Sequence, residues 1–290
     1  VQMATDLLPL DYENIASNSQ MPEKYRLRGT NVSQYNLVFG EIFRMRMSAR
    51  IAMAFRAKAA LLGASPAFAE GTTVTWEEAA DYNGDLLDLI GGVSGLAANG
   101  NTWYKNADEI TNLGAGANPK EMLWRNSKDA TAFALEQAQF PPSLYGSGQI
   151  NPTHNLVNAF PMANGYPITM TEGNYDKDNP YANRDPVLNI YVVVKESNVG
   201  IDEKVIDTSV DNTTDNDGLN KENNHSTRTG YYLRKHLRED VYLSSTSQNG
   251  QPHYSPRIRY TELFLNYAEA ANEAWGPTGT GDHGYSAYDV

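Results

Sequence analysis

The stretch "RYTELFLNYAEAANEAWG", residues 259–276, places a large aromatic or aliphatic side chain on every turn, with alanines between them. Spacings of three and four residues are typical of one face of an amphipathic α-helix. This face comprises Tyr260, Leu263, Phe264, Tyr267, Ala268, Ala271, Ala274 and Trp275. The alanines allow a second helix to approach closely while the rings fill the groove beside it. We therefore expect a packing helix without a catalytic role, ended by Gly276 and the proline that follows.

Residues 34–64 and 76–90 predict further helices with small and apolar side chains on one face. The first segment predicts one long helix or two abutting helices, and the Ser-Pro pair after it ends the helix. Thr75 is placed to cap the second, with Glu78 three residues later completing a capping box. The spacing of tryptophan and alanines after Thr75 weakly matches the first helix of a tetratricopeptide repeat. We expect a helix–loop–helix pair.

From residue 92 to 255 the helical pattern stops, and glycine, proline, asparagine and aspartate recur every few residues. Short apolar runs such as residues 188–194 predict strands. The acidic run 211–224 predicts a mobile surface excursion. So long a loop-rich interval is reasonable where a rigid helical scaffold carries functional loops.

Bulk composition excludes several classes of function. The 290 residues carry a formal net charge of −12, which disfavours nucleic acid and polyanionic ligands. Cysteine is absent, which removes disulfides, thiolate metal sites and thiol nucleophiles. No apolar run is long enough to span a bilayer, and the first residues lack the features of a signal peptide. The sequence thus predicts a cytosolic protein, or a processed or truncated part of an exported one.

Several short runs resemble catalytic or cofactor-binding motifs, but none has the full pattern that such a site requires. The run "GTGDHG" (279–284) follows a helix instead of a strand, so it is not a dinucleotide site. The run 213–224 lacks acidic residues at the first and twelfth positions of a calcium loop. The five histidines show no metal-binding spacing, and no serine elbow or paired carboxylates stand out. We predict no enzyme, no cofactor and no metal. The 18 tyrosines and 4 tryptophans instead favour a surface for polar, neutral ligands.

Six segments, in order along the chain, are similar to one known family. They are residues 46–68 (ending Ala-Ser-Pro-Ala-Phe), 75–90, 151–168 ("NPTHNLVNAFPMANGYPI"), 179–194 ("NPYANRDPVLNIYVVV"), 229–237 ("TGYYLRKHL") and 256–274 ("PRIRYTELFLNYAEAANEA"). Together they resemble the SusD/RagB family of outer-membrane glycan-binding lipoproteins. Val187 departs from the family's usual arginine, and the family's lipid-bearing cysteine and first helical repeats are absent here.

The resemblance implies a mainly α fold, in which tetratricopeptide-like helix pairs (an α-α superhelix) carry long loops and a few short strands. We expect residues 1–290 to form one incomplete SusD-like domain. Its parts are a helical scaffold at 34–90, a loop-rich ligand-binding part at 92–255 and a C-terminal scaffold helix at 256–276.

The resemblance also implies function: non-catalytic capture of oligosaccharides at the extracellular face of the outer membrane. The captured glycan is handed to a SusC-like TonB-dependent transporter, and the membrane is contacted only through a lipid anchor that this sequence does not carry. Peptide capture, as in the RagB branch, and a purely structural helical-repeat scaffold are the alternatives.

Three aromatic residues are the predicted sugar platforms. Trp103 lies in a Gly/Asn-rich loop, Tyr145 lies in a Pro/Gly-rich loop, and Trp124 is expected to be half-buried at the end of a short strand. Nothing periodic surrounds Trp103 and its neighbour Tyr104 to bury both rings. The predicted hydrogen-bond partners for sugar hydroxyls are Asn101, Arg125 and Asn126. The alternative for each aromatic is a ring that only anchors its own loop.

Overall fold

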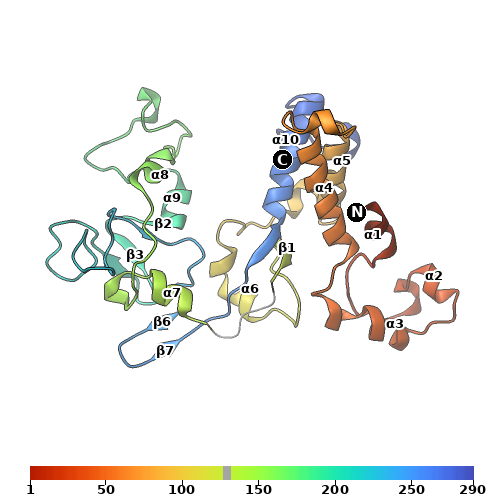
Figure 1. Ribbon diagram of the computed structural model, residues 1–290, viewed down its shortest axis with the longest axis horizontal. Coiled ribbons are helices and arrows are strands. Elements are labelled where there is room, and N and C mark those ends of the chain that lie inside the picture. Colours follow the sequence, from red (N-terminus) through yellow and green to blue (C-terminus); the bar gives the residue numbers. More distant parts are fainter. Residues whose placement is uncertain (127–131) are drawn as a thin grey trace. The chain divides into compact units, whose positions relative to one another are not determined.

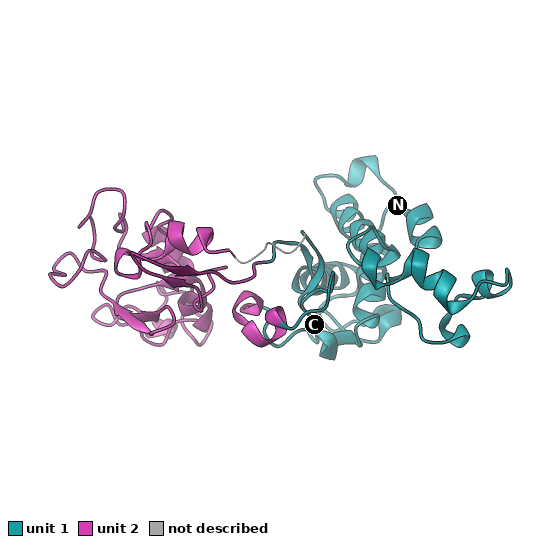
Figure 2. Cartoon of the chain, turned by 90° about the horizontal axis from the view of Figure 1, so that it is seen from below, with its two compact units in different colours: residues 1–100, 112–128, 254–290 teal, residues 101–111, 129–253 magenta. Residues whose placement is uncertain are grey.

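The computed structural model describes residues 1–126 and 132–290, in which the chain forms two compact units (Figure 2). Unit 1 comprises residues 1–100, 112–128 and 254–290, and unit 2 comprises residues 101–111 and 129–253. Unit 1 therefore holds the predicted scaffold segments, and unit 2 holds most of the loop-rich interval.

Helices dominate the regular structure of unit 1 (Figure 1). They are α1 (Gln2–Leu7), α2 (Glu23–Arg26), α3 (Val32–Phe39), α4 (Ala49–Ala64), α5 (Trp76–Asp88) and α10 (Tyr260–Trp275). Strands β1 (Met122–Arg125) and β8 (Pro256–Arg259) pair antiparallel beside them. Unit 2 has shorter elements: α6 (Ala107–Thr111), α7 (Ala134–Gln139), α8 (His154–Ala159), α9 (Pro186–Tyr191), β2 (Val192–Val193), β3 (Ser197–Val199), β4 (Lys204–Ile206), β5 (Tyr232–Leu233), β6 (Tyr242–Leu243) and β7 (Gln248–Asn249). The prediction of a mainly α protein with a few short strands is confirmed.

Helices α4, α5 and α10 pack along one another around the core of unit 1 (Figure 1). Their facing alanines are fully buried: Ala54, Ala57, Ala79, Ala80, Ala270 and Ala271. Small side chains at these points let the helix axes approach. Leu263, Phe264 and Tyr267 of α10 fill the remaining space, and burying side chains of this size contributes about 1.5–3 kcal/mol each. The predicted packing role of residues 259–276 is confirmed, although Ala270 is fully buried where Ala268 and Ala274 are only partly covered.

Residues 34–64 contain two helices, but they do not abut as predicted, because residues 40–48 lie between them. Helix α3 ends before Gly40, and a short 3-10 turn, Glu41–Phe43, separates it from α4. Ser48 begins α4 because its side-chain oxygen accepts a hydrogen bond from the amide of Ile51. Helix α4 ends at Ala64, before the Ser-Pro pair, as predicted.

The capping box predicted for α5 is confirmed. The amide of Glu78 donates to Thr75 Oγ1 at 3.1 Å, and the amide of Thr75 donates to Glu78 Oε2 at 3.0 Å. Two backbone donors that have no partner within the helix are thereby satisfied.

The segment after α10 folds back onto α5 and α10. The hydroxyl of Tyr285 donates to the Gly84 carbonyl at 3.2 Å and to Asp88 Oδ1 at 3.0 Å. His283 Nδ1 lies 2.7 Å from Asp88 Oδ2, and Tyr267 donates its hydroxyl proton to the Tyr285 carbonyl. Side chains of both helices therefore hold this segment in place.

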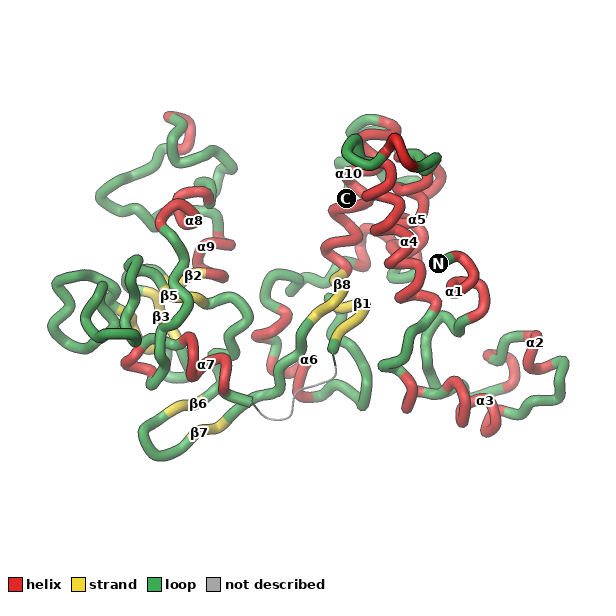
Figure 3. The backbone as a smooth tube through the Cα atoms, viewed as in Figure 1, coloured by secondary structure: helices red, strands yellow, loops and turns green. Residues whose placement is uncertain are grey.

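Unit 2 is built mostly from loops, which are joined by small antiparallel strand pairs (Figure 3). The pairs are β2–β5, β3–β4 and β6–β7. Two compact apolar clusters hold the loops together, one around Phe140 and Tyr232 and the other around Leu188 and Tyr231. None of the helices in the described part of the chain combines the length and the hydropathy needed to cross a bilayer.

The strand predicted at residues 188–194 is wrong for its first half. Residues 186–191 form α9, because Asp185 accepts a hydrogen bond from the amide of Val187 and Pro186 begins the helix with a suitable φ. Only Val192 and Val193 pair as a strand. A local cap therefore overrides the β preference of the apolar run.

Candidate functional site

Tyr145 lies on a rigid, sharply turned segment of unit 2. Pro141 and Pro142 begin a 3-10 turn that ends at Tyr145, whose φ of 60° is left-handed. The next residue must be small, since a Cβ on Gly146 would lie 2.1 Å from the Phe140 carbonyl oxygen. The Tyr145 side chain is 55% exposed. The backbone therefore presents the ring to solvent from a fixed position.

The buried carboxylate of Asp217, which belongs to the acidic segment 211–224, anchors this turn. Asp217 is fully buried, accepts a hydrogen bond from the Ser143 amide at 2.8 Å and also accepts one from the Ser143 hydroxyl. Burial raises the pKa of Asp217, and the bonds from Ser143 oppose that rise. The sequence predicted a surface excursion here, whereas the structure shows a segment pinned at its centre.

The Tyr145 ring opens onto a groove of about 620 Å³ that lies wholly within unit 2. Its lining residues are Ala134, Gln137, Ala138, Pro142, Tyr145, Gly146, Ser147, Gln149, Glu222, His225, Ser244, Ser245 and Gln248. We call this the Tyr145 groove. Amide and hydroxyl side chains, which both donate and accept hydrogen bonds, predominate beside one exposed aromatic face. The ionisable pair in the lining is Glu222 and His225, whose side chains approach to 3.4 Å.

Two walls supply most of the lining of the Tyr145 groove, and Glu222 and His225 come from a third segment. One wall is α7 with the segment that follows it, in which the amides of Ser147 and Gln149 donate to the carbonyls of Gln137 and Ala138. The other is the β6–β7 hairpin, which contributes Ser244, Ser245 and Gln248. Of the six site residues predicted from sequence, the groove contains Tyr145 alone.

Trp103 is buried in unit 2, so the expectation that nothing covers it and Tyr104 is wrong. The two side chains are 2% and 3% exposed. Their rings pack edge to face at 5.6 Å, and His236 lies 6.1 Å from the Trp103 ring centre. Burial raises the pKa of Tyr104 to about 12. The ring partner comes from 133 positions away, which no local sequence pattern reveals.

Asn101 is exposed, and its side-chain oxygen accepts a hydrogen bond from the Tyr191 hydroxyl at 3.0 Å. Neither Asn101 nor Trp103 belongs to the lining of the Tyr145 groove.

Trp124 lies on β1 in unit 1 and is half-buried, as predicted. The edge of the Phe55 ring contacts it at 5.7 Å, and the Arg257 guanidinium lies 5.1 Å from its ring centre. Asn126, which is exposed, accepts a hydrogen bond from Arg257 Nε at 2.6 Å. Trp124 and Asn126 thus share a cationic neighbour.

Arg125 points the other way and is only 3% exposed. Its guanidinium donates to the carbonyls of Ala117 and Asn126 and lies 4.3 Å from the Tyr254 ring centre. Burial lowers the pKa of Arg125, against an opposing effect of Tyr254. These contacts make Arg125 a brace for β1, and its predicted availability to a ligand is wrong because its guanidinium is buried and bonded to backbone carbonyls of unit 1.

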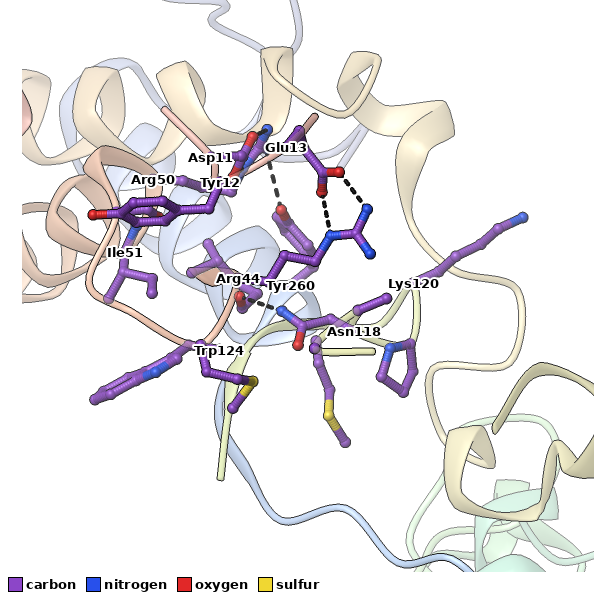
Figure 4. A pocket seen from close by; sticks show the side chains of 17 residues that line it. Asp11, Tyr12, Glu13, Arg44, Arg50, Ile51, Asn118, Lys120, Trp124 and Tyr260 are labelled. Carbon is purple, nitrogen blue, oxygen red and sulfur yellow. Dashed lines mark hydrogen bonds and ion pairs between the residues drawn. The ribbon is translucent and has the colours of Figure 1, made fainter. Parts of the chain in front are cut away.

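Trp124 also borders a cavity of about 320 Å³ inside unit 1 (Figure 4). Arg50 pairs with Asp11 at 2.6 Å and donates to the Tyr260 hydroxyl, and Arg44 pairs with Glu13. Both guanidinium groups are therefore occupied by carboxylates of the N-terminal segment. Within the described residues, no group of three or more histidine, aspartate or glutamate side chains is arranged to hold a metal ion.

Solved structures with a similar fold include two SusD-like proteins. A SusD-like carbohydrate-binding protein from Bacteroides fragilis matches with a TM-score of 0.57 and 19% identity over 94% of this chain and 44% of that protein. A second SusD-like protein from Bacteroides fragilis matches with a TM-score of 0.58 and 18% identity over 95% of this chain and 48% of that protein. The chain thus spans about half the length of these structures. Comparison with curated protein sequences finds no match.

The model of the SusD family matches residues 103–284, well over half of the chain. This interval includes the Tyr145 groove, β8 and the scaffold helix α10. The chain belongs to the SusD family.

Proposed function

We propose that this protein is a non-catalytic glycan-binding protein, and that the Tyr145 groove holds part of an oligosaccharide. A half-exposed tyrosine on a rigid turn, facing a groove of amides and hydroxyls, is the observation that carries the proposal. The apolar face of a sugar ring stacks on an aromatic ring, while its hydroxyls exchange hydrogen bonds with glutamine and serine side chains.

We expect weak binding, because the groove is open and offers few aromatic platforms. One aromatic platform contributes about 1 kcal/mol beyond the area that it buries. An open groove with few platforms therefore gives dissociation constants on the order of mM to μM. Trp124 with Asn126 in unit 1, and Asn101 in unit 2, are proposed as secondary contacts, because these side chains reach the surface.

Membership of the SusD family supports the remaining steps of the proposal. The protein acts at the extracellular face of the outer membrane and delivers its glycan to a SusC-like TonB-dependent transporter. Binding without hydrolysis is consistent with the described lining of the groove, in which the Glu222 carboxylate lies beside a histidine and not beside a second carboxylate.

Affinity gels containing a panel of polysaccharides test this proposal. At least one glycan should retard the protein, and Tyr145→Ala should migrate faster than the parent on that gel. Tyr166→Ala is the matched control, since Tyr166 is 45% exposed in unit 2 but lies outside the groove. Retention by a protein digest and by no glycan would favour peptide capture, and retention by neither would favour a scaffold.

A further inference from the structure

Glu136 and His253 join the two walls of the Tyr145 groove. Glu136 belongs to α7, next to the lining residue Gln137, and its side chain is fully buried. His253 follows the β6–β7 hairpin, and its side chain is 14% exposed. The two side chains meet at 2.9 Å, from His253 Nε2 to Glu136 Oε1.

The contacts of His253 define its protonation state. Nε2 faces the Glu136 carboxylate, and Nδ1 lies 2.8 Å from the carbonyl oxygen of Gln251. Both partners accept hydrogen bonds, whereas a neutral imidazole carries a single N–H. Only the imidazolium makes both bonds. Burial lowers the pKa of His253, but the hydrogen bond and charge of Glu136 and the Gln251 carbonyl outweigh it, so the pKa is raised above its ordinary value.

The other charged groups nearby are already paired. Arg238 is buried, and its guanidinium binds both oxygens of Asp240 at 2.8 and 2.6 Å and donates to the Pro252 carbonyl. Its backbone amide donates to the same Glu136 oxygen that contacts His253, at 2.7 Å. The second Glu136 oxygen is buried without a hydrogen-bond partner. Among the described residues, His253 is the cation whose side chain contacts the Glu136 carboxylate.

We propose that His253 is a positioning residue for the ligand: its imidazolium holds the β6–β7 hairpin against α7 and so sets the width of the Tyr145 groove. This inference rests on the proposed function of the groove. When His253 loses its proton, one of its two bonds breaks and Glu136 keeps a buried, uncompensated charge. The contact of the imidazolium with Glu136 therefore stabilises the hairpin position fully below the unfolded pKa of histidine. This stabilisation is lost as the pH rises through the pKa of His253 in the folded protein. Glycan affinity should therefore fall as pH rises.

Calorimetric titration of the parent and of His253→Gln with the retained glycan, from about pH 5.5 to 9, tests the inference. Glutamine keeps one donor for Glu136 and does not titrate. The parent should lose at least about threefold in affinity across this range, and His253→Gln should show a clearly smaller loss. His154→Gln, which removes an exposed histidine of unit 2 outside the groove lining, should keep the slope of the parent.

A parent without pH dependence, or a His253→Gln variant with the same slope as the parent, overturns the positioning role and leaves glycan binding intact. Absence of glycan binding at every pH overturns the proposed function and the positioning role together. Should His253→Gln fail to fold, long-range ¹H–¹⁵N spectra of the parent decide without any ligand. Protons on both ring nitrogens of His253 at neutral pH support the proposal, and a neutral ring overturns it.

Discussion

Replacing Gly84 by alanine should destabilise unit 1, although this change usually stabilises a helix. Gly84 lies in the interior of α5, where alanine is favoured over glycine by about 1 kcal/mol. A Cβ at this position would lie 2.3, 2.5 and 2.6 Å from three atoms of the His283 ring. Asp88 holds that ring at 2.7 Å, so it cannot turn aside freely. Overpacking at the upper end of its range costs about 3 kcal/mol, which gives a net loss of about 2 kcal/mol.

Urea unfolding followed by circular dichroism measures this loss, and a double-mutant cycle identifies its cause. With His283→Ala in the background, the clash is absent and Gly84→Ala should be neutral or stabilising. The coupling free energy between the two positions should therefore be about 2–3 kcal/mol. A stabilising Gly84→Ala in the parent background, or a coupling free energy below about 0.5 kcal/mol, would show that the C-terminal segment does not pack on α5 as described.

Three further predictions concern packing, pH and chemistry. Ala271→Leu should lower the free energy of unfolding by about 1–3 kcal/mol, because Ala271 is fully buried between helices. Asn272→Leu, on the exposed side of α10, should change it by no more than about 0.5 kcal/mol. Equal melting temperatures for the two variants would count against the described packing of α10. Burial disfavours the charged form of Asp240, but its contacts with Arg238 outweigh this effect and lower the pKa of Asp240. The charged Asp240 therefore stabilises the fold above its unfolded pKa, and this stabilisation is lost as the pH falls through the folded pKa. Asp240→Asn should flatten the pH dependence of the free energy of unfolding below about pH 5, and an unchanged slope would remove Asp240 from that account. Purified protein should release no more reducing sugar from polysaccharides than a heat-treated control does, and release above that level would make it a hydrolase.

The helical scaffold was predictable because its determinants are local. The spacing in residues 259–276, the Thr75–Glu78 capping box and the Ser-Pro pair after residue 64 each act within one or two turns of helix. Sequence therefore gives the position of α5 and α10 almost to the residue. The break between α3 and α4 was harder to place: α3 ends before Gly40, a 3-10 turn follows, and Ser48 caps α4.

The candidate site was predictable only in part, because exposure is decided by partners far along the chain. Tyr145 is exposed as its Pro/Gly loop suggested. Trp103 occupies a similar loop but is covered by Tyr104 and by the distant His236. Arg125 is buried on β1, whose pairing with β8 joins positions 131 residues apart.

The glutamines and serines of the Tyr145 groove had no distinguishing pattern in the sequence. They come from α7, from the loop after it and from the β6–β7 hairpin, which meet only in the folded unit. The Glu136–His253 contact joins residues 117 positions apart and was equally invisible.

Calorimetric titration of the parent chain and of Tyr145→Ala with the glycan selected on gels tests glycan capture in the Tyr145 groove most directly. The parent should bind saturably, with a dissociation constant between about 1 mM and 1 μM. Loss of the aromatic platform should weaken binding about fivefold or more, while Tyr166→Ala binds like the parent. Equal affinity of the parent and Tyr145→Ala would contradict the account, because the exposed ring of this groove would then make no contact with the sugar.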